Sequence, residues 1–206
     1  MKGHSTLVLA ACAALLALNA SAGTLVFSDN FAGDTLALGV TDASTNNLLP
    51  NWNIVAGNVD VIGSDGVNSF YDFYPGMGKY LDLDGSGEAS NAKIQTVASF
   101  GPGQYTLTFD LGNNPGGGAS QNDLDVYLGT TLIAHLMTSG SPALAHESFT
   151  FSSLASGNLS FTQGGPSDQQ GSILGNVQMM TATPEPGTFA VLGAGLLGLG
   201  LLRRRK

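Results

Sequence analysis

Alternation between apolar and polar residues is the feature that most restricts how this chain can fold. From Tyr105 to Leu111 every second residue is large and apolar, and the residues between them are threonine or aspartate. The stretch from Leu124 to Leu128 repeats the pattern. A strand with one buried face and one solvated face has this period of two. Residues 23–182 show no clear 3.6-residue helical period, so we expect an all-β domain.

Eight further segments have strand-like composition. Turn signals such as Asp84-Gly85, Gly129-Thr130 and Ser141-Pro142 lie between the predicted strands. The eight segments cover residues 24–28, 53–62, 79–83, 92–98, 131–137, 146–151, 158–162 and 172–180. Many short strands at this spacing predict an antiparallel β-sandwich of the jelly-roll type over residues 23–182.

The first 22 residues are organised like a secretory signal peptide. Lys2 precedes the apolar residues 7–18, and Ala20-Ser21-Ala22 is a cleavage site for signal peptidase. Leu9 to Cys12 also fits a lipobox, which would leave Cys12 lipidated. The apolar run continues well past Cys12, which favours cleavage after residue 22. The mature chain then contains no cysteine, and therefore no disulfide or thiol nucleophile.

The last two dozen residues contain three ordered elements. These are the triplet Pro184, Glu185 and Pro186, the uncharged apolar residues 187–202, and the basic end Arg203, Arg204, Arg205 and Lys206. As a helix the apolar run would measure about 24 Å, enough to cross a bilayer if the flanking basic side chains snorkel. The basic end predicts a cytoplasmic C-terminus, which leaves the preceding domain outside. Because proline cannot continue a helix, the triplet is expected to be accessible at the outer membrane surface.

This order of triplet, short apolar helix and arginine cluster resembles the PEP-CTERM sorting signal of Gram-negative bacteria. Pro184, Glu185 and Pro186 match its motif, and Arg203 to Arg205 match its basic end. The resemblance implies an exported protein that is anchored briefly in the inner membrane and is cut near the triplet by exosortase, a membrane-embedded cysteine protease or transpeptidase. The product would reach the cell surface or extracellular matrix. The alternative is an ordinary tail anchor with a chance Pro-Glu-Pro.

The charge of the predicted domain is strongly negative. Residues 23–182 contain fourteen acidic residues and only two basic residues, Lys79 and Lys93, for a net charge of about −12. Such a surface repels phosphate backbones, so we expect no nucleic-acid partner. Soluble behaviour outside the cell, or binding of divalent cations, fits this charge better.

A second resemblance involves most of the domain. Asn51-Trp52, Tyr80 to Ser86, Gly103 to Asn113 and Ile173 to Val177 resemble segments of galactose-binding-like jelly-roll domains, which occur on secreted bacterial and plant wall proteins. The resemblance implies a non-catalytic carbohydrate-binding or adhesive module. The sequence departs from the family at Gly175, where an aspartate usually precedes Asn-Val, and this departure argues against a cation site there.

Aromatic residues can offer flat faces to sugar rings, while a few polar side chains fix the orientation of the ligand. The candidate carbohydrate-binding residues are Trp52, Tyr71, Tyr74 and Asn113, with exopolysaccharide or another glycan as ligand. Because the stretch from Phe70 to Tyr74 is too aromatic to be wholly exposed, some of its rings are expected in the core instead.

Calcium is the only cofactor that the sequence suggests. Asp82, Asp84, Ser86 and Glu88 place oxygen atoms at alternate positions, as a calcium loop does. The twelfth position of an EF-hand-like loop would be Lys93, which cannot ligate a cation. The competing interpretation is a strand that ends in a polar Asp-Gly turn.

No catalytic constellation is evident. After signal cleavage only His135 and His146 remain, too few for a three-histidine zinc site, and the chain has no Gly-x-Ser-x-Gly motif. His135 lies in an apolar run, which is typical of an edge or core histidine. We therefore expect a non-enzymatic surface or matrix protein that binds glycan or calcium weakly. The alternatives are a ligand-free structural matrix protein and a polysaccharide-active enzyme that uses paired carboxylates such as Asp82 and Asp84.

Overall fold

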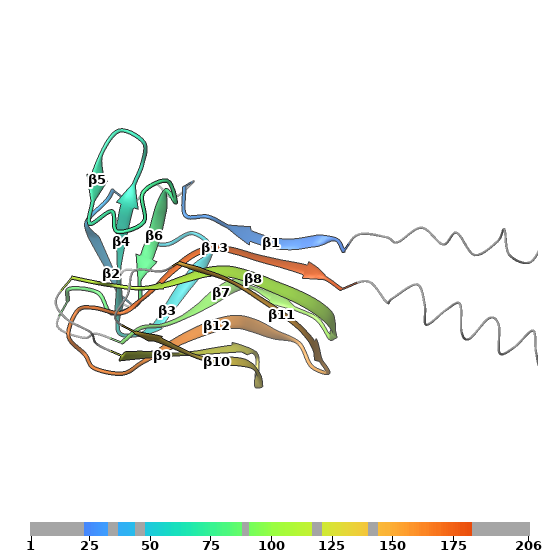
Figure 1. Ribbon diagram of the computed structural model, residues 1–206. Helices are drawn as coiled ribbons and strands as arrows, with labels where there is room; N and C mark the ends of the chain where they lie inside the picture. Colours follow the sequence, from blue (N-terminus) through green and yellow to red (C-terminus); the bar gives the residue numbers. More distant parts are fainter. Residues whose placement is uncertain are drawn as a thin grey trace, which may run out of the picture. The chain divides into compact units, whose positions relative to one another are not determined.

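A computed structural model describes residues 23–32, 37–43, 48–87, 91–116, 121–139 and 144–182 (Figure 1). The predicted signal peptide, sorting triplet, membrane helix and basic tail all lie outside these residues. The described part forms strands and turns without a helix, so it contains no helix that could cross a membrane. Its contacts define one compact body, Thr24–Thr181.

Two antiparallel sheets make up this body. The eight-stranded sheet has the order β11 (Ala145–Ser153), β8 (Gly103–Asn113), β13 (Ser172–Thr181), β6 (Lys79–Asp82), β4 (Asn58–Ser64) and β2 (Val40–Ala43), with β1 (Leu25–Asp29) paired to β13 and β5 (Ser69–Phe70) paired to β4. The five-stranded sheet has the order β10 (Thr131–Ser139), β9 (Gln121–Leu128), β12 (Gly157–Gly164), β7 (Lys93–Phe100) and β3 (Trp52–Ala56). The predicted antiparallel sandwich is therefore confirmed. Most successive strands from β6 onward lie in alternate sheets, a connectivity typical of jelly rolls.

Every segment predicted as a strand contains one. The predicted segment 53–62 is two strands, because Gly57 adopts a positive φ of 65° and turns the chain from β3 in one sheet to β4 in the other. The short strands β2 and β5 were not predicted, since four and two residues are too few to show an alternation.

The core lies between the sheets and is rich in aromatic rings. On β8 the alternation places Leu107 and Phe109 fully inside, while Thr106 and Thr108 face outward. Phe161 of β12 meets Phe109 edge to face with ring centroids 5.2 Å apart, and it also contacts the ring of Trp52 at 5.8 Å. Rings and aliphatic side chains from both sheets thus form one continuous core.

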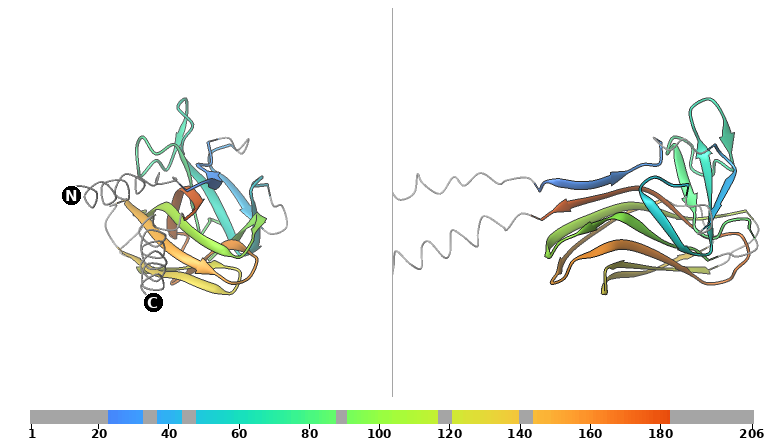
Figure 2. Two further views of the ribbon diagram at one scale, coloured as in Figure 1. Left: turned by 90° about the vertical axis from the view of Figure 1, so that its right-hand side faces the viewer. Right: turned by 180° about the vertical axis from the view of Figure 1, so that it is seen from behind.

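The first and last strands meet at one end of the body, and the loops next to Asn113 and Ser172 lie at the other end. Thr181 donates its backbone N–H to the carbonyl of Thr24 at 2.9 Å. The start of β1 therefore lies beside the end of β13 (Figures 1 and 2). The register of β8 and β13 runs from Tyr105 opposite Thr181 to Asn113 opposite Ser172. At about 3.4 Å per residue, these two positions on β8 are about 27 Å apart. The loops that follow Asn113 and precede Ser172 therefore lie at the end opposite Thr24 and Thr181.

Candidate functional site

A hollow of about 320 Å³ lies among the loops that adjoin Asn113 and Ser172. We call it the loop hollow. The aromatic residues that line it are Phe70, Tyr71 and Phe73, and its polar lining includes Asp60, Asp82, Ser86, Asn114, Asp168, Gln169 and Gln170. No lysine or arginine is among the described residues of this lining. The hollow thus combines aromatic faces with hydrogen-bonding groups and negative charge.

Tyr71 is the most accessible ring of this lining. The residue is 64% exposed, and its ring stacks on Phe73 with centroids 5.9 Å apart and ring planes at 19°. Phe70 contacts the same tyrosine edge to face at 4.5 Å. Tyr71 also has a positive φ of 45°, a conformation that costs free energy in a non-glycine residue and is often found at functional sites.

Two buried tyrosines hold the loop that carries these rings. The hydroxyl of Tyr80 accepts the N–H of Phe73 at 2.7 Å and donates to the carbonyl of Tyr71 at 3.1 Å. The hydroxyl of Tyr74 donates to the carbonyl of Asn113 at 2.8 Å and accepts its N–H at 3.0 Å. Burial raises the pKa of Tyr80 to about 12 and also raises the pKa of Tyr74. Both hydroxyls therefore stay neutral and keep their donor role at physiological pH.

Asp84 fixes the opposite wall of the loop hollow. This carboxylate is fully buried and its Oδ2 accepts the backbone N–H groups of Asp168, Gln169 and Gln170 at 2.9, 2.7 and 3.3 Å. Its Oδ1 accepts the N–H of Asn91 at 2.8 Å. One side chain thus positions a loop that is 84 to 86 residues away in the sequence.

Asp82 lies beneath the hollow and is equally enclosed. Its Oδ1 accepts the N–H groups of Asp84 at 3.0 Å and Gly171 at 2.9 Å, and its Oδ2 accepts the amide of Asn114. Burial nevertheless raises the pKa of Asp82 to about 7, because the three donors only partly offset the loss of hydration.

Of the expected calcium ligands, Asp82 and Asp84 are bonded to N–H donors, and Glu88 lies outside the described residues. The oxygens of the two aspartates face N–H donors, which a cation would have to displace, and calcium needs six to eight oxygen ligands. The described residues contain no group of three or more acidic, histidine or cysteine side chains that could hold a metal ion. The strand-and-turn interpretation of this segment agrees with the end of β6 at Asp82.

The four predicted carbohydrate-binding residues have different environments. Trp52 has no exposed surface, and its Nε1 donates to Asp29 Oδ2 at 2.9 Å, so its ring offers no face to a ligand. Tyr74 is buried against Tyr80. Asn113 is also buried, and its Oδ1 accepts the side chains of Asn122 and Thr138. Only Tyr71 presents an accessible ring, and the structure does not bring the four together at one surface.

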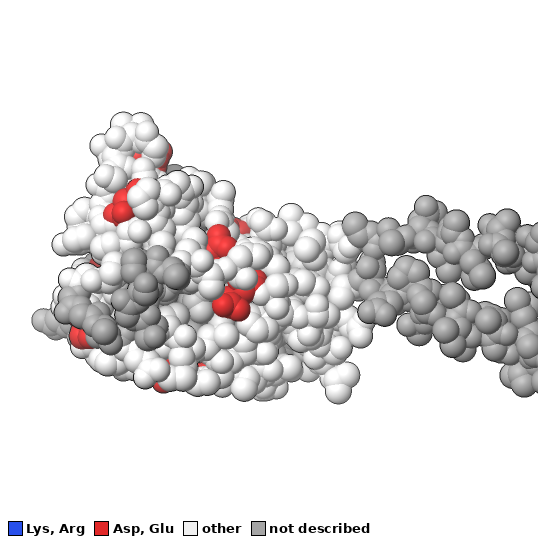
Figure 3. All heavy atoms as spheres, viewed as in Figure 1, with Lys and Arg blue, Asp and Glu red and all other residues white. Residues whose placement is uncertain are grey.

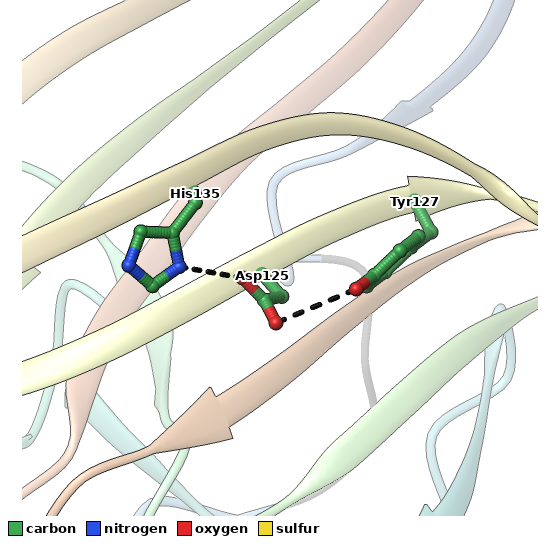
Figure 4. A network of polar contacts seen from close by, with 3 residues as sticks. All are labelled: Asp125, Tyr127 and His135. Carbon is green, nitrogen blue, oxygen red and sulfur yellow. Dashed lines mark hydrogen bonds and ion pairs between the residues drawn. The ribbon is translucent and has the colours of Figure 1, made fainter.

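The outer face of the five-stranded sheet carries a separate polar group at its edge. His135 of β10 donates from Nδ1 to Asp125 Oδ1 on β9 at 2.7 Å, and Tyr127 Oη approaches Asp125 Oδ2 at 3.5 Å (Figure 4). The hydrogen bond with Asp125 raises the pKa of His135. Because β10 is the edge strand of its sheet, His135 is an edge histidine, which is one of the two environments expected from the sequence. The pair is open to solvent and forms no enclosed reaction site.

Acidic side chains are scattered over the body. On the face in Figure 3 they form separate patches, and the described residues visible there include no lysine or arginine. This distribution agrees with the charge balance of the sequence, in which Lys79 and Lys93 are the only basic residues of the domain.

One family comparison gives a match at the C-terminus. Residues 182–206 match the family described as the PEP-CTERM protein-sorting motif. The chain carries a PEP-CTERM sorting motif. The matched range includes the Pro-Glu-Pro triplet and the arginine cluster that the sequence analysis selected, and the motif indicates an exported protein that is sorted through the membrane. A search of curated proteins found no match.

Comparison with solved structures finds proteins of low sequence identity, among them carbohydrate-binding modules. TmCBM27, a mannan-recognising module, is 11% identical with a TM-score of 0.47 over 79% of this chain and 100% of that chain. The K1 cleaved adhesin domain of Lys-gingipain from Porphyromonas gingivalis W83 is 10% identical with a TM-score of 0.47 over 70% and 98%. The MgGH51 α-L-arabinofuranosidase is 14% identical with a TM-score of 0.49 over 80% of this chain but only 27% of the enzyme.

Proposed function

We propose that this is an exported surface or matrix protein of a Gram-negative bacterium, and that its sandwich binds a glycan in the loop hollow. Signal peptidase removes residues 1–22, the tail holds the intermediate in the inner membrane, and exosortase cuts near Pro184 to Pro186. The sorting part of the proposal is supported by the PEP-CTERM match, and the export part by the signal-like N-terminus. Neither the sorting part nor the export part of the proposal includes a catalytic activity of the β-sandwich.

Both processing steps predict the mass of the mature protein. Material recovered from the envelope and medium of the producing organism is expected to begin at Gly23 and to end between Pro184 and Gly187. Intact-mass spectrometry of that material checks both ends at once, and a strain without exosortase serves as the control, in which residues 203–206 are retained. Retention of those basic residues in the normal strain would mean a plain tail anchor.

The accessible face of Tyr71 is the observation that supports glycan binding. It is stacked on Phe73 at the edge of a hollow whose other lining groups are carboxylates and amides. Sugars are recognised by this combination, because the C–H face of the ring packs on an aromatic side chain while the hydroxyls bond to polar groups. A volume of about 320 Å³ is within the range of small-ligand sites.

The charge of the lining restricts the ligand. Asp60 and Asp168 both line the loop hollow, and no described lysine or arginine lines it. Uronic acids and sulfated sugars would meet like charge there, which is unfavourable at short range. We therefore propose that the ligand is a neutral or positively charged glycan.

Substitution of Tyr71 tests the proposed site. Tyr71→Ala is expected to weaken binding to neutral glycans on an array at least about tenfold, because the stacking face is lost. Tyr127→Ala is the matched control, since it removes a tyrosine from the face of the other sheet. Equal binding by wild type and Tyr71→Ala would contradict the site. Retention of uronic-acid glycans in preference to neutral ones would contradict the inferred charge of the ligand.

A further inference from the structure

A second hollow adjoins the first. It has a volume of about 560 Å³ and lies over the outer face of the eight-stranded sheet; we call it the face hollow. Its apolar lining includes Phe73, Met77 and Leu144, and its polar lining is Asp110 and Asn176. Phe73 lines both hollows. The two hollows therefore lie on either side of Phe73, and Phe73 belongs to the loop that the hydroxyls of Tyr74 and Tyr80 hold in place.

The two polar residues of the face hollow, Asp110 and Asn176, are bonded to each other, and Asp110 is also bonded to His146, which lies outside the lining. Asp110 Oδ1 accepts the Nδ1–H of His146 at 2.7 Å, and Asp110 Oδ2 accepts the amide of Asn176 at 2.6 Å. These residues belong to β8, β11 and β13, three neighbouring strands of the same sheet. His146 keeps 65% of its side-chain surface exposed, so its second ring nitrogen is open to a ligand.

The backbone of β13 is distorted where it supplies Asn176. The register with β8 is irregular between Gly175 and Gln178, and Asn176 has a positive φ of 48°. A bulge of this kind redirects a side chain, and asparagine is one of the few non-glycine residues that adopt this φ readily. A Cβ atom on Gly175 would lie 1.8 Å from Cε of Met77, so Met77 occupies the space above this residue. The glycine that departs from the galactose-binding-like pattern thus makes room for the apolar wall of the face hollow.

Non-glycine residues with a left-handed backbone concentrate at the two hollows. Non-glycine residues with positive φ in the described part are Phe31, Tyr71, Asn91, Gln169 and Asn176. Of these, Tyr71 and Gln169 line the loop hollow and Asn176 lines the face hollow. Three of the five lie along one continuous surface that includes Phe73. The two that are not asparagine, Tyr71 and Gln169, have a conformational cost of the kind often found at functional sites.

We propose that the face hollow is a second sugar subsite and that the ligand is an oligosaccharide chain that passes over Phe73 from one hollow to the other. The apolar faces of Met77 and Phe73 pack against one sugar ring, and the linked His146, Asp110 and Asn176 bond to its hydroxyls. The proposal rests on glycan binding in the loop hollow. It adds that a chain of at least two sugar residues binds more tightly than a single sugar, so affinity increases with chain length.

A length series tests this proposal. The probes are β-1,4-linked oligomers of mannose, glucose and N-acetylglucosamine with one to six residues, titrated calorimetrically into the domain. For the series that binds, affinity is expected to rise about tenfold once the chain is long enough to enter the face hollow, which corresponds to about 1.4 kcal/mol. Asn176→Gly keeps the left-handed backbone and removes the amide, so it is expected to abolish most of this rise.

His146→Ala is the second variant, because an exposed side chain on an edge strand can be removed without disturbing the core. It is expected to reduce the same increase with length, whereas Tyr71→Ala weakens binding at every length. Affinity that is equal at all lengths, or a rise that both Asn176→Gly and His146→Ala retain, would overturn the second subsite while glycan binding stands. If no oligomer of any length binds, glycan binding and the second subsite both fail.

Discussion

Replacement of Asp84 by alanine is expected to lower the free energy of unfolding by roughly 3–5 kcal/mol, the size typical of a broken buried charge network. The carboxylate accepts four backbone N–H groups, three of them from the loop Asp168 to Gln170. Without it these donors are left unsatisfied in a buried position, and each costs about 1–3 kcal/mol unless water reaches it. Because the same loop lines the loop hollow, glycan binding should be lost together with stability.

Urea unfolding of the domain, residues 23–182, measures this effect. Asp65→Ala is the matched control, since Asp65 also accepts two backbone N–H groups but does so in an exposed turn. Asp84→Asn keeps one acceptor oxygen and should fall between wild type and the alanine variant. A midpoint for Asp84→Ala that is no lower than that of Asp65→Ala would show that Asp84 does not hold the loop.

Stability is expected to fall as the pH rises from about 4 to about 7 because of Asp82. Burial raises its pKa in the folded state to about 7, from 3.8 for the ordinary side chain. Over this interval the folded protein keeps the proton and the unfolded chain has released it, so each pH unit lowers the free energy of unfolding by about 1.4 kcal/mol. Between pH 5 and pH 8 the loss from this group is on the order of 3 kcal/mol.

Denaturant titrations at a series of pH values check this dependence, with Asp82→Asn as the comparison. The asparagine cannot titrate, so its profile should be nearly flat over the same range. His135 also has a raised pKa and favours folding at low pH, but it is exposed and its effect should be small. His135→Ala separates the two, and a steep profile that survives in Asp82→Asn would exclude this carboxyl as the cause.

The strands were predictable from the sequence because the alternation of apolar and polar residues within each segment is a local signal. The alternation around Leu107 and Phe109 specifies which side chains enter the core, and the structure has them there. The exceptions are β2 and β5, which are held in place by pairing with β4 rather than by a pattern of their own. The chain turns at Gly57, but nothing local indicates that this turn carries the chain into the other sheet.

The candidate site was less predictable, because its parts are distant in the sequence. Composition identified the stretch from Phe70 to Tyr74 as aromatic but could not say that Tyr71 is exposed while Tyr74 bonds to Asn113, 39 residues later. Trp52 was predicted as a carbohydrate-binding residue, yet its indole N–H donates a hydrogen bond to Asp29 inside the core. Asp110 and Asn176 become neighbours only through the pairing of β8 and β13, and no local signal marks them.

The pairing of β1 with β13 also determines how the protein can be held. Since Thr24 and Thr181 are hydrogen-bonded to each other, a solid surface coupled at either end of the domain is attached to the same place on the sandwich. That place is about 27 Å along β8 from the loops of the hollow. On a sensor chip, coupling through Thr24 or through Thr181 should therefore present the loop hollow in the same orientation.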